Sequence, residues 1–307
     1  MIYDVRQTTT CHYASPVAQA RHVLRLTPVA RDGQRVHVAA LQIVPEPVQR
    51  REGQDFFGNR LTWIDINAPH DTLTVKLAAR VAVDPPPAVD GAPDAPPSPA
   101  WETVREDAFA SSDIEPMSPA HFLFQSRMIS LDPEITEYTR ESFPPGRPVL
   151  DAAKELIARL KADIVYEIGA TTVTTTPPMS FALRHGVCQD FAHIMISGLR
   201  GLGLPAAYVS GYLRTAPRND AARLQGADAM HAWVLLWCGP PVSLPLAHER
   251  IGRGWIGLDP TNAVLASEDH VTLAIGRDYT DVAPMDGVIL GSGGQRVDVS
   301  VNVVPVD

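Results

Sequence analysis

The chain has 307 residues, of which 45% are apolar and 20% are charged. A globular chain of this length can bury a large core without help from disulfides or structural metals. The formal net charge is −9, and no long run of either sign occurs. Charge and composition therefore argue against non-specific binding to nucleic acid or to an anionic membrane as the main role.

Targeting signals and the spacing of the cysteines indicate the cellular compartment and the kind of site to expect. Residues 1–16 contain no apolar core of the signal-peptide kind, and no stretch approaches the roughly 18 apolar residues that span a bilayer. The cysteines Cys11, Cys188 and Cys238 do not have the spacing of a disulfide framework or a zinc site. We therefore expect a cytoplasmic protein with no cofactor, in which thiol chemistry depends on a single cysteine.

The N-terminal part is rich in short, often alternating segments of β-branched residues. Such segments are typical of strands, and the Gly, Pro, Asn and Asp residues between them are typical of turns. The predicted strands are 23–29, 36–45, 61–66 and 73–83. Because no helical segment separates them, we expect an antiparallel sheet or sandwich over residues 1–83.

A proline-rich stretch follows this N-terminal domain. Seven prolines lie between residues 84 and 99. Proline does not continue a helix or a central strand, so 84–100 is expected to be an exposed linker or long loop. The remaining chain divides into a core, 101–293, and a C-terminal segment, 294–307, whose alternating pattern favours a strand that returns to a sheet.

Helical periodicity appears within the core. Apolar residues recur on one face of residues 149–160, and Pro148 suits a first helical turn. A second helix is predicted to begin at or just before Cys188 and to end near Gly201. Apolar strands are then expected at 206–213, 231–238 and 254–260. Helices followed by strands predict an α+β core.

Cys188 is the candidate nucleophile. A cysteine in the first turn of a helix lies among unpaired backbone N–H groups at the positive end of the helix dipole. Both favour the thiolate, which is the reactive form. The backbone N–H of Cys188 would also point toward an oxyanion formed at an attacked carbonyl. The alternative is a buried structural cysteine, which we expect for Cys11 and Cys238.

His231 and Asp259 are the candidate partners of Cys188. His231 is at the start of a strongly apolar strand, where a titratable ring is unusual. Asp259 is at the end of another apolar strand. A carboxylate at a strand end can face a histidine on the neighbouring strand, fix its tautomer and support the imidazolium. The alternatives are a hydrogen-bonded core histidine and an aspartate that begins a turn before Pro260.

Three motifs in this order resemble the bacterial transglutaminase-like cysteine peptidase family: GVCQDFAHIMISGLRGLGLPAAYVSGYL, DAMHAWVLLW and GWIGLDPTN. HYASPVAQARHVLRLTP and DFFGNRLTWIDINAPHDTLTV resemble the N-terminal β domain of that family, and GRDYTDVAPMDGVILGSG resembles the segment after its core. The resemblance covers nearly the whole chain except the proline-rich stretch. It implies an α+β fold with a papain-like, transglutaminase-like core and an N-terminal antiparallel β-sandwich.

The resemblance also implies a mechanism. Cys188 is the nucleophile, His231 the general base and then acid, and Asp259 the orienting carboxylate. Attack on an amide bond of a peptide or protein substrate gives a thioester. Water completes proteolysis or deamidation, whereas an amine completes cross-linking.

One departure concerns the oxyanion. Animal transglutaminases use a tryptophan well upstream of the cysteine, but this sequence has no tryptophan between Trp101 and Trp233. Tyr166 is a candidate replacement. Gln189 and Asp190 are further candidate supporting residues in the first turn of the helix, where Asp190 could simply complement the helix dipole.

Three functions therefore remain open. The preferred one is a cysteine peptidase or amidase, and the second is a protein-glutamine transglutaminase with an amine acceptor. The third is a non-catalytic interaction module on the same fold, which the intact set of Cys188, His231 and Asp259 disfavours. A metal site built on these residues lacks a credible fourth ligand. No sequence feature specifies an oligomeric state.

Overall fold

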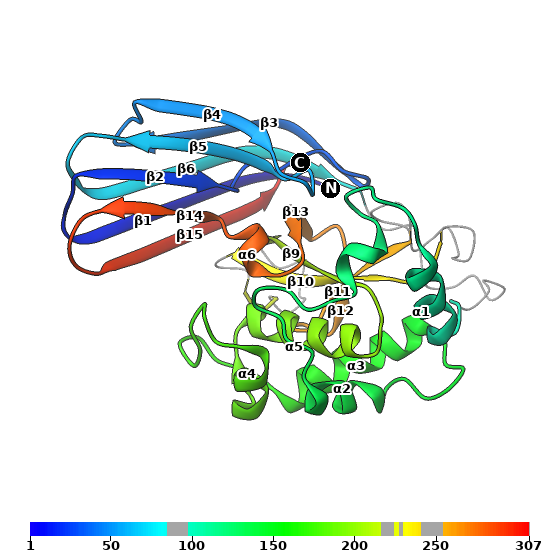
Figure 1. The fold of residues 1–307 in the computed structure, drawn as a ribbon. Coiled ribbons are helices and arrows are strands. Elements are labelled where there is room, and N and C mark those ends of the chain that lie inside the picture. Colours follow the sequence, from blue (N-terminus) through cyan, green and yellow to red (C-terminus); the bar gives the residue numbers. More distant parts are fainter. Residues whose placement is uncertain (85–97, 216–223, 227–229, 241–253, 307) are drawn as a thin grey trace.

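The computed structural model describes residues 1–84, 98–215, 224–226, 230–240 and 254–306. Most of the predicted proline-rich linker therefore lies outside the described residues. The chain forms a β-sandwich that lies across one side of an α+β core (Figure 1). The predicted α+β architecture, a mixed core with an antiparallel β-sandwich, is confirmed.

The sandwich consists of two four-stranded antiparallel sheets. One has the order β15 (Gln295–Pro305), β1 (Ile2–Val17), β6 (His70–Val83) and β3 (Gln34–Val44). The other has the order β14 (Met285–Leu290), β2 (Gln19–Leu24), β5 (Arg60–Ile66) and β4 (Gln49–Gln54). Apolar residues at alternate positions of β6, such as Leu73, Val75 and Val81, are buried between the sheets, as the period of a strand requires.

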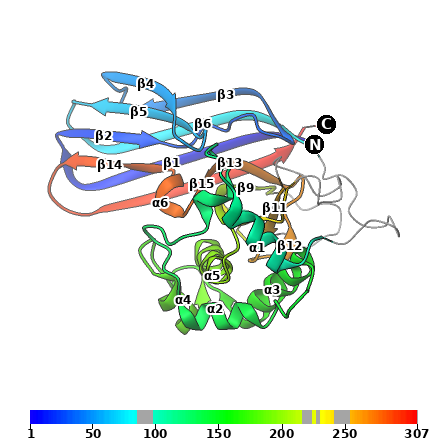
Figure 2. The same ribbon diagram turned by 45° about the vertical axis from the view of Figure 1, so that its right-hand side comes forward.

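The sandwich takes strands from both ends of the chain. β15 pairs with β1 along a register that runs from Tyr3 opposite Pro305 to Tyr13 opposite Gln295. β14 falls within 101–293, the range expected to form the core, yet it pairs with β2. The two termini lie near each other (Figures 1 and 2), and the N–H of Val306 donates to the carbonyl of Ile2.

The core contains a five-stranded antiparallel sheet and a layer of helices. The sheet order is β12 (Val264–Leu265), β11 (Trp255–Asp259), β10 (Met230–Trp237), β9 (Ala206–Leu213) and β13 (His270–Gly276). The helices are α1 (Trp101–Ala110), the 3₁₀ helix η1 (Pro119–Phe122), α2 (Pro133–Arg140), α3 (Val149–Asp163), α4 (Pro177–Leu183), α5 (Cys188–Gly201) and α6 (Tyr279–Val282). A short parallel pair, β7 (Val165–Tyr166) and β8 (His185–Gly186), leads into α5. No helix of the described residues is long and apolar enough to cross a membrane.

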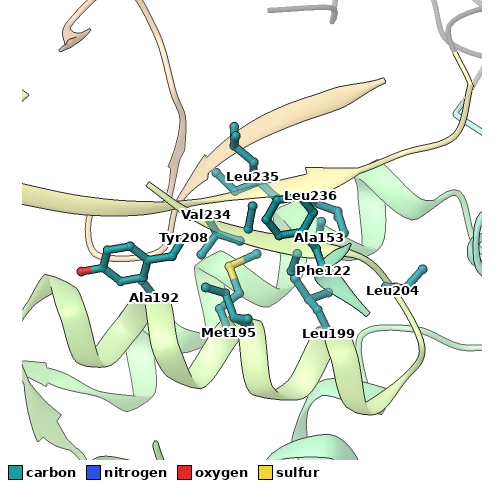
Figure 3. Packing of buried hydrophobic residues seen from close by; sticks show 14 of the residues in the cluster. Phe122, Ala153, Ala192, Met195, Leu199, Leu204, Tyr208, Val234, Leu235 and Leu236 are labelled. Atoms are coloured by element: carbon teal, nitrogen blue, oxygen red, sulfur yellow. The ribbon is translucent and has the colours of Figure 1, made fainter. Parts of the chain in front are cut away.

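Helix α5 is the central element of the core. Every residue from Gln189 to Arg200 is buried, and Met195 and Leu199 pack under β10 (Figure 3). Figure 2 shows α5 nearly end-on among α2, α3 and α4. A Cβ at Gly198 would lie 1.9 Å from Oγ1 of Thr139 on α2, so this close helix contact requires glycine.

Side-chain amides of the sandwich region bind the free edge of β13. The amide of Gln34 donates to the carbonyl of Thr272 and accepts from its N–H, both at 2.8 Å. Asn59 makes the same pair of bonds to Ile275 at 2.7 and 2.8 Å. These contacts satisfy backbone groups that a neighbouring strand would otherwise pair. They fix the sandwich against the core sheet.

Candidate active site

Cys188 is the first residue of α5 and is half-buried. Asp190 folds back to accept from the N–H of Val187 at 2.8 Å, which satisfies one of the free backbone groups at the helix start. The hydroxyl of Thr171 donates to the same oxygen at 2.6 Å. A Cβ at Gly186 would lie 2.7 Å from this carboxylate, so glycine permits the turn that presents the sulfur.

His231 and Asp259 form a buried pair on neighbouring strands. His231 lies at the start of β10 and Asp259 at the end of β11, and these strands are antiparallel, so both residues come to the same end of the sheet. Nε2 of His231 lies 2.9 Å from Oδ2 of Asp259. Both side chains are fully buried. The bond assigns a proton to Nε2 and leaves Nδ1 as the ring nitrogen that Asp259 does not contact.

The carboxylate of Asp259 is surrounded by donors. Oδ1 accepts from the backbone N–H groups of Thr261 and Asn262 at 3.0 and 3.1 Å. Oδ2 also accepts from the side-chain amide of Asn262 at 2.8 Å. Burial alone would raise the pKa of Asp259, but His231 and His270 outweigh it and hold the pKa well below its usual range. Asp259 is therefore a fixed negative charge.

His270 is a second histidine on this carboxylate, and it was not identified from the sequence. Its Nε2 lies 3.3 Å from Oδ2 of Asp259, and its Nδ1 accepts from the N–H of Ser267 at 3.1 Å. The acceptor role of Nδ1 assigns the proton to Nε2. The one available signal was that His270, like His231, opens an apolar strand.

The structure brings Cys188 and His231 together. The sulfur of Cys188 lies 4.0 Å from the carbonyl oxygen of Met230, the residue before His231. Nδ1 of His231 is buried and makes no hydrogen bond of ordinary geometry to the described residues, although the Cys188 side chain lies close enough to act on the ring. Burial lowers the pKa of His231, but the charge and hydrogen bond of Asp259, together with the Cys188 thiolate, raise it to about 10.

Residues 225 and 226 cover the histidine. The N–H of Gln225 donates to Oδ1 of Asn262 at 2.9 Å, and the amide of Asn262 donates to the carbonyl of Gln225 at 3.3 Å. Gly226 has a φ of +85°, and a Cβ there would lie 2.6 Å from Nδ1 of His231. Asn262 therefore connects the carboxylate to the segment that packs over the ring.

The candidate supporting residues lie around the start of α5 in different roles. Tyr166 pairs with Gly186, two residues before Cys188. Gln189 donates its side-chain amide to the carbonyl of Val173 at 3.1 Å. Asp190 caps the helix start, and burial raises its pKa although Thr171 and Val187 oppose this effect. The contacts of Gln189 and Asp190 support the backbone around the sulfur.

Tyr208 is a further residue that was not singled out from the sequence. It is buried on β9, and its hydroxyl extends past Ala192 toward the start of α5 (Figure 3). Burial, followed by the negative charge of Cys188, raises the pKa of Tyr208 well above its usual value. The hydroxyl therefore remains a neutral donor on the side of α5 that faces β9. Because Tyr208 lies in an ordinary apolar strand, nothing in the sequence around it indicates that it is near Cys188.

Other histidines and carboxylates do not add a metal site. Among the residues that the structure describes, no group of three or more His, Cys, Asp or Glu side chains could hold a metal ion. His193 is buried one turn after the helix start and accepts from the N–H of Tyr279 at 3.3 Å. Burial lowers the pKa of His193 to about 4, so its ring is neutral.

Two family models match the chain. Residues 3–82 match the bacterial transglutaminase-like N-terminal region, and residues 136–260 match the transglutaminase-like superfamily. The second range contains Cys188, His231 and Asp259.

Similar proteins and structures extend over nearly the whole chain. An uncharacterised protein of Mycobacterium tuberculosis (strain ATCC 25618 / H37Rv) is 35% identical over 309 residues, which cover 99% of this chain and 93% of the relative. A protein of Mycobacterium leprae (strain TN) is 31% identical, with coverage of 95% and 94%. The crystal structure of a candidate cysteine protease from Cytophaga hutchinsonii matches with a TM-score of 0.72 at 20% identity, covering 100% of this chain and 92% of that one. The chain therefore belongs to the transglutaminase-like superfamily and has the bacterial transglutaminase-like N-terminal region.

Proposed function

We propose that this protein is a cysteine peptidase or amidase that cleaves amide bonds of a peptide or protein substrate through a thioester. Cys188 is the nucleophile, His231 the acid and base, and Asp259 the group that orients His231. The observation that supports this most directly is the buried 2.9 Å bond between His231 and Asp259, with Nδ1 left for the side on which Cys188 lies. The raised pKa of His231 favours a resting thiolate–imidazolium pair.

In the first half-reaction, the Cys188 sulfur attacks the carbonyl carbon and forms a C–S bond. The carbonyl oxygen becomes an oxyanion, for which the backbone N–H of Cys188 at the helix start is a suitable donor. The C–N bond then breaks, and the leaving nitrogen takes the proton from Nδ1 of His231. The acyl half of the substrate remains on the sulfur as a thioester.

In the second half-reaction, neutral His231 accepts a proton from water, and the water oxygen attacks the thioester carbonyl. The C–S bond breaks, the acid product leaves, and the thiolate and imidazolium are restored. Asp259 keeps the proton on Nε2 throughout, so that Nδ1 is the nitrogen that exchanges protons. Each residue thus has a role that its hydrogen bonds support.

Selective alkylation tests the nucleophile. We expect iodoacetamide to modify Cys188 at pH 7 at least ~10-fold faster than glutathione, because a thiolate paired with an imidazolium is the reactive form. Cys11 and Cys238 are buried and serve as internal controls. In His231→Ala the rate at Cys188 should fall to that of an ordinary thiol. Labelling of wild-type Cys188 no faster than glutathione would contradict the proposal.

A product assay identifies the acyl acceptor. Dimethylcasein is incubated with the protein with and without monodansylcadaverine, and new amino termini, released ammonia and incorporated fluorescent amine are quantified. A hydrolase gives amino termini or ammonia in excess over incorporated amine. Predominant incorporation would assign the protein as a transglutaminase, and Cys188→Ala provides the blank for all three products.

The cytoplasmic location also belongs to this proposal. Cys11, Cys188 and Cys238 are all free thiols. A protein that depends on one reduced cysteine is suited to a reducing compartment. Cell fractionation with antibody detection tests the location, and recovery from the periplasmic fraction would overturn it.

A further inference from the structure

The β-sandwich opens toward the start of α5. A cavity of about 530 Å³ lies between the two sheets at the edge formed by β14 and β15. One sheet contributes residues of β1 and β15 to its walls, and the other contributes residues of β2 and β14. The cavity therefore enters the sandwich from its edge.

The opening is apolar and is confined to one end of β15. Along one face of this strand, the exposed fraction falls from 46% at Val297 and 42% at Val299 to 8% at Val301 and 0% at Val303. Val301 and Val303 belong to a buried cluster that includes Tyr212 and Val271 of the core sheet, whereas Val297 and Val299 line the cavity. Ile289 of β14 lines the open end from the opposite sheet and is 37% exposed.

His22 lines the same cavity and has unused hydrogen-bonding capacity. The residue is 8% exposed, and the backbone of Asp286 lies beside the ring, but neither ring nitrogen makes a hydrogen bond of ordinary geometry to a described residue. Gly287 lies opposite on β14, where a Cβ would come within 2.7 Å of Nδ1. Burial lowers the pKa of His22, although Asp286 opposes this effect, so the ring is neutral at pH 7. A neutral imidazole offers one donor and one acceptor, as a peptide group does.

Two residues that line the cavity contact Cys188 or the residue after it. Met230 lines it, and the carbonyl of Met230 lies 4.0 Å from the Cys188 sulfur. Val173 also lines it and accepts a hydrogen bond from Gln189, the residue after Cys188. Val173 and Tyr279 line a second cavity as well, of about 440 Å³, on the side of residues 125–130. The two cavities thus share Val173 and Tyr279 in their walls.

We propose that the opening of the sandwich is a substrate subsite that takes an apolar side chain of an extended polypeptide next to the bond that is cleaved, and that His22 hydrogen-bonds to a peptide group of that segment. This inference rests on the proposed function of Cys188. The lining favours an uncharged segment, because Asp286 is the one carboxylate among the described residues that line it, which are mainly apolar or carry amides. A ligand that pairs with the His22 ring removes the cost of burying it unpaired.

Alkylating peptides of defined sequence test the subsite on both sides of the reacting thiol. N-acetyl tetrapeptidyl chloromethyl ketones extend on the acyl side, and N-bromoacetyl tetrapeptides extend on the leaving-group side. In both, the sulfur displaces a halide ion and forms a C–S bond. Each series contains an all-glycine parent and four peptides with one leucine. The alkylation rate at Cys188 is divided by the iodoacetamide rate of the same variant.

In wild-type protein we expect leucine at one position of one series to raise the normalised rate roughly 10-fold or more over the glycine parent, as burial of a leucine side chain predicts. Val299→Asp should remove this gain, and it replaces a residue that is 42% exposed, so the core stays intact. Val38→Asp, at a position 60% exposed on β3, is the matched control and should retain the gain. His22→Ala should lower the normalised rate of the leucine peptide by ~5-fold, and His22→Gln should restore most of it.

Each alternative outcome has a definite meaning. No leucine effect in either series, or an effect that persists in both Val299→Asp and His22→Ala, overturns the subsite. A wild-type dimer that Val299→Asp converts to a monomer would assign the opening to self-association and would also overturn it. Slow iodoacetamide labelling of wild-type Cys188 would instead overturn the proposed function, so the two failures are distinguishable.

Discussion

His270 contacts the Asp259 oxygen that His231 also contacts: Nε2 of His270 lies 3.3 Å from Oδ2. Its other nitrogen is occupied by the N–H of Ser267. Both nitrogens of the His270 ring are therefore hydrogen-bonded. A flip of the ring or a change of its tautomer would break one of these bonds. In the proposed mechanism, His270 would therefore be a positioning residue for Asp259 that does not touch the reacting atoms.

We expect His270→Leu to lower both stability and the efficiency of the site. Loss of a donor to a buried carboxylate should lower the free energy of unfolding by about 1–3 kcal/mol, measured by urea denaturation. The normalised pH profile of Cys188 alkylation should also change, because Asp259 would hold His231 less firmly. His12→Leu is the control, since His12 is a partly exposed histidine on the sandwich that also faces a carboxylate, Asp298. A change in stability with an identical pH profile would limit His270 to a structural role.

Cys188→Ala should abolish turnover while leaving the fold intact. Members of a triad act as a unit, so loss of the nucleophile should lower kcat by roughly three or more orders of magnitude. The sulfur is half-buried at a helix start, and alanine suits that backbone. Product formation and thermal unfolding of the same preparation provide the measurement. Retained turnover in a folded variant would remove Cys188 from the mechanism.

Asp259→Asn should lower kcat roughly 10⁴-fold, because an amide no longer fixes the proton on Nε2 of His231. The thiol should remain present and titratable with Ellman's reagent after unfolding. The matched variant is Asp281→Asn, which changes an aspartate paired with Arg277 near the surface and leaves the His231 environment untouched. Equal activity of the Asp259 and Asp281 variants would exclude an orienting role for Asp259.

That Cys188, His231 and Asp259 lie close together could be predicted, because all three are at the ends of strongly apolar elements. The helix after Gly186 and the strands around 231–237 and 255–259 have clear apolar patterns, and their ends hold Cys188, His231 and Asp259. His270 and Tyr208 were not identified, because their role depends on which strands become neighbours in the sheet. A sequence alone does not specify such pairings.

The sandwich was predicted less completely, for a related reason. β1 contains TTTCHY, in which threonine occupies several positions, and it was not among the predicted strands. β4 has the sequence QRREGQ and lies at a sheet edge, where polar residues are tolerated and give no apolar signal. That β14 joins β2 and that Val299 lines a cavity are consequences of tertiary packing.

Stability should fall between neutral and alkaline pH through His231. Its pKa is raised to about 10 in the folded protein, against about 6.5 in an unfolded chain. The folded state therefore binds this proton more tightly. The resulting stabilisation is fully present below the unfolded pKa and is lost as the pH rises through the folded pKa. Urea unfolding at pH 6, 8 and 10 should show a decrease in wild-type protein that His231→Gln lacks. An equal decrease in both would contradict the assignment.

Gly226→Ala should impair the site through a steric contact with His231. The new Cβ would lie 2.6 Å from Nδ1, the nitrogen proposed to exchange protons with Cys188. Asn262 holds the adjacent Gln225 in place, so the segment cannot relax freely. Either the ring or the segment must move, and we expect iodoacetamide labelling of Cys188 to slow by at least ~10-fold, since proton-transfer geometry tolerates small displacements poorly.

Gly58→Ala separates this contact from backbone strain. Gly58 has a φ of +75°, close to the +85° of Gly226, but a Cβ there would meet no described atom within 4 Å beyond its chain neighbours. Both variants should lose about 1 kcal/mol of stability from a left-handed alanine. Only Gly226→Ala should also slow alkylation of Cys188, because only there does the methyl group meet the imidazole. Equal alkylation rates in the two variants would show that residue 226 does not constrain His231.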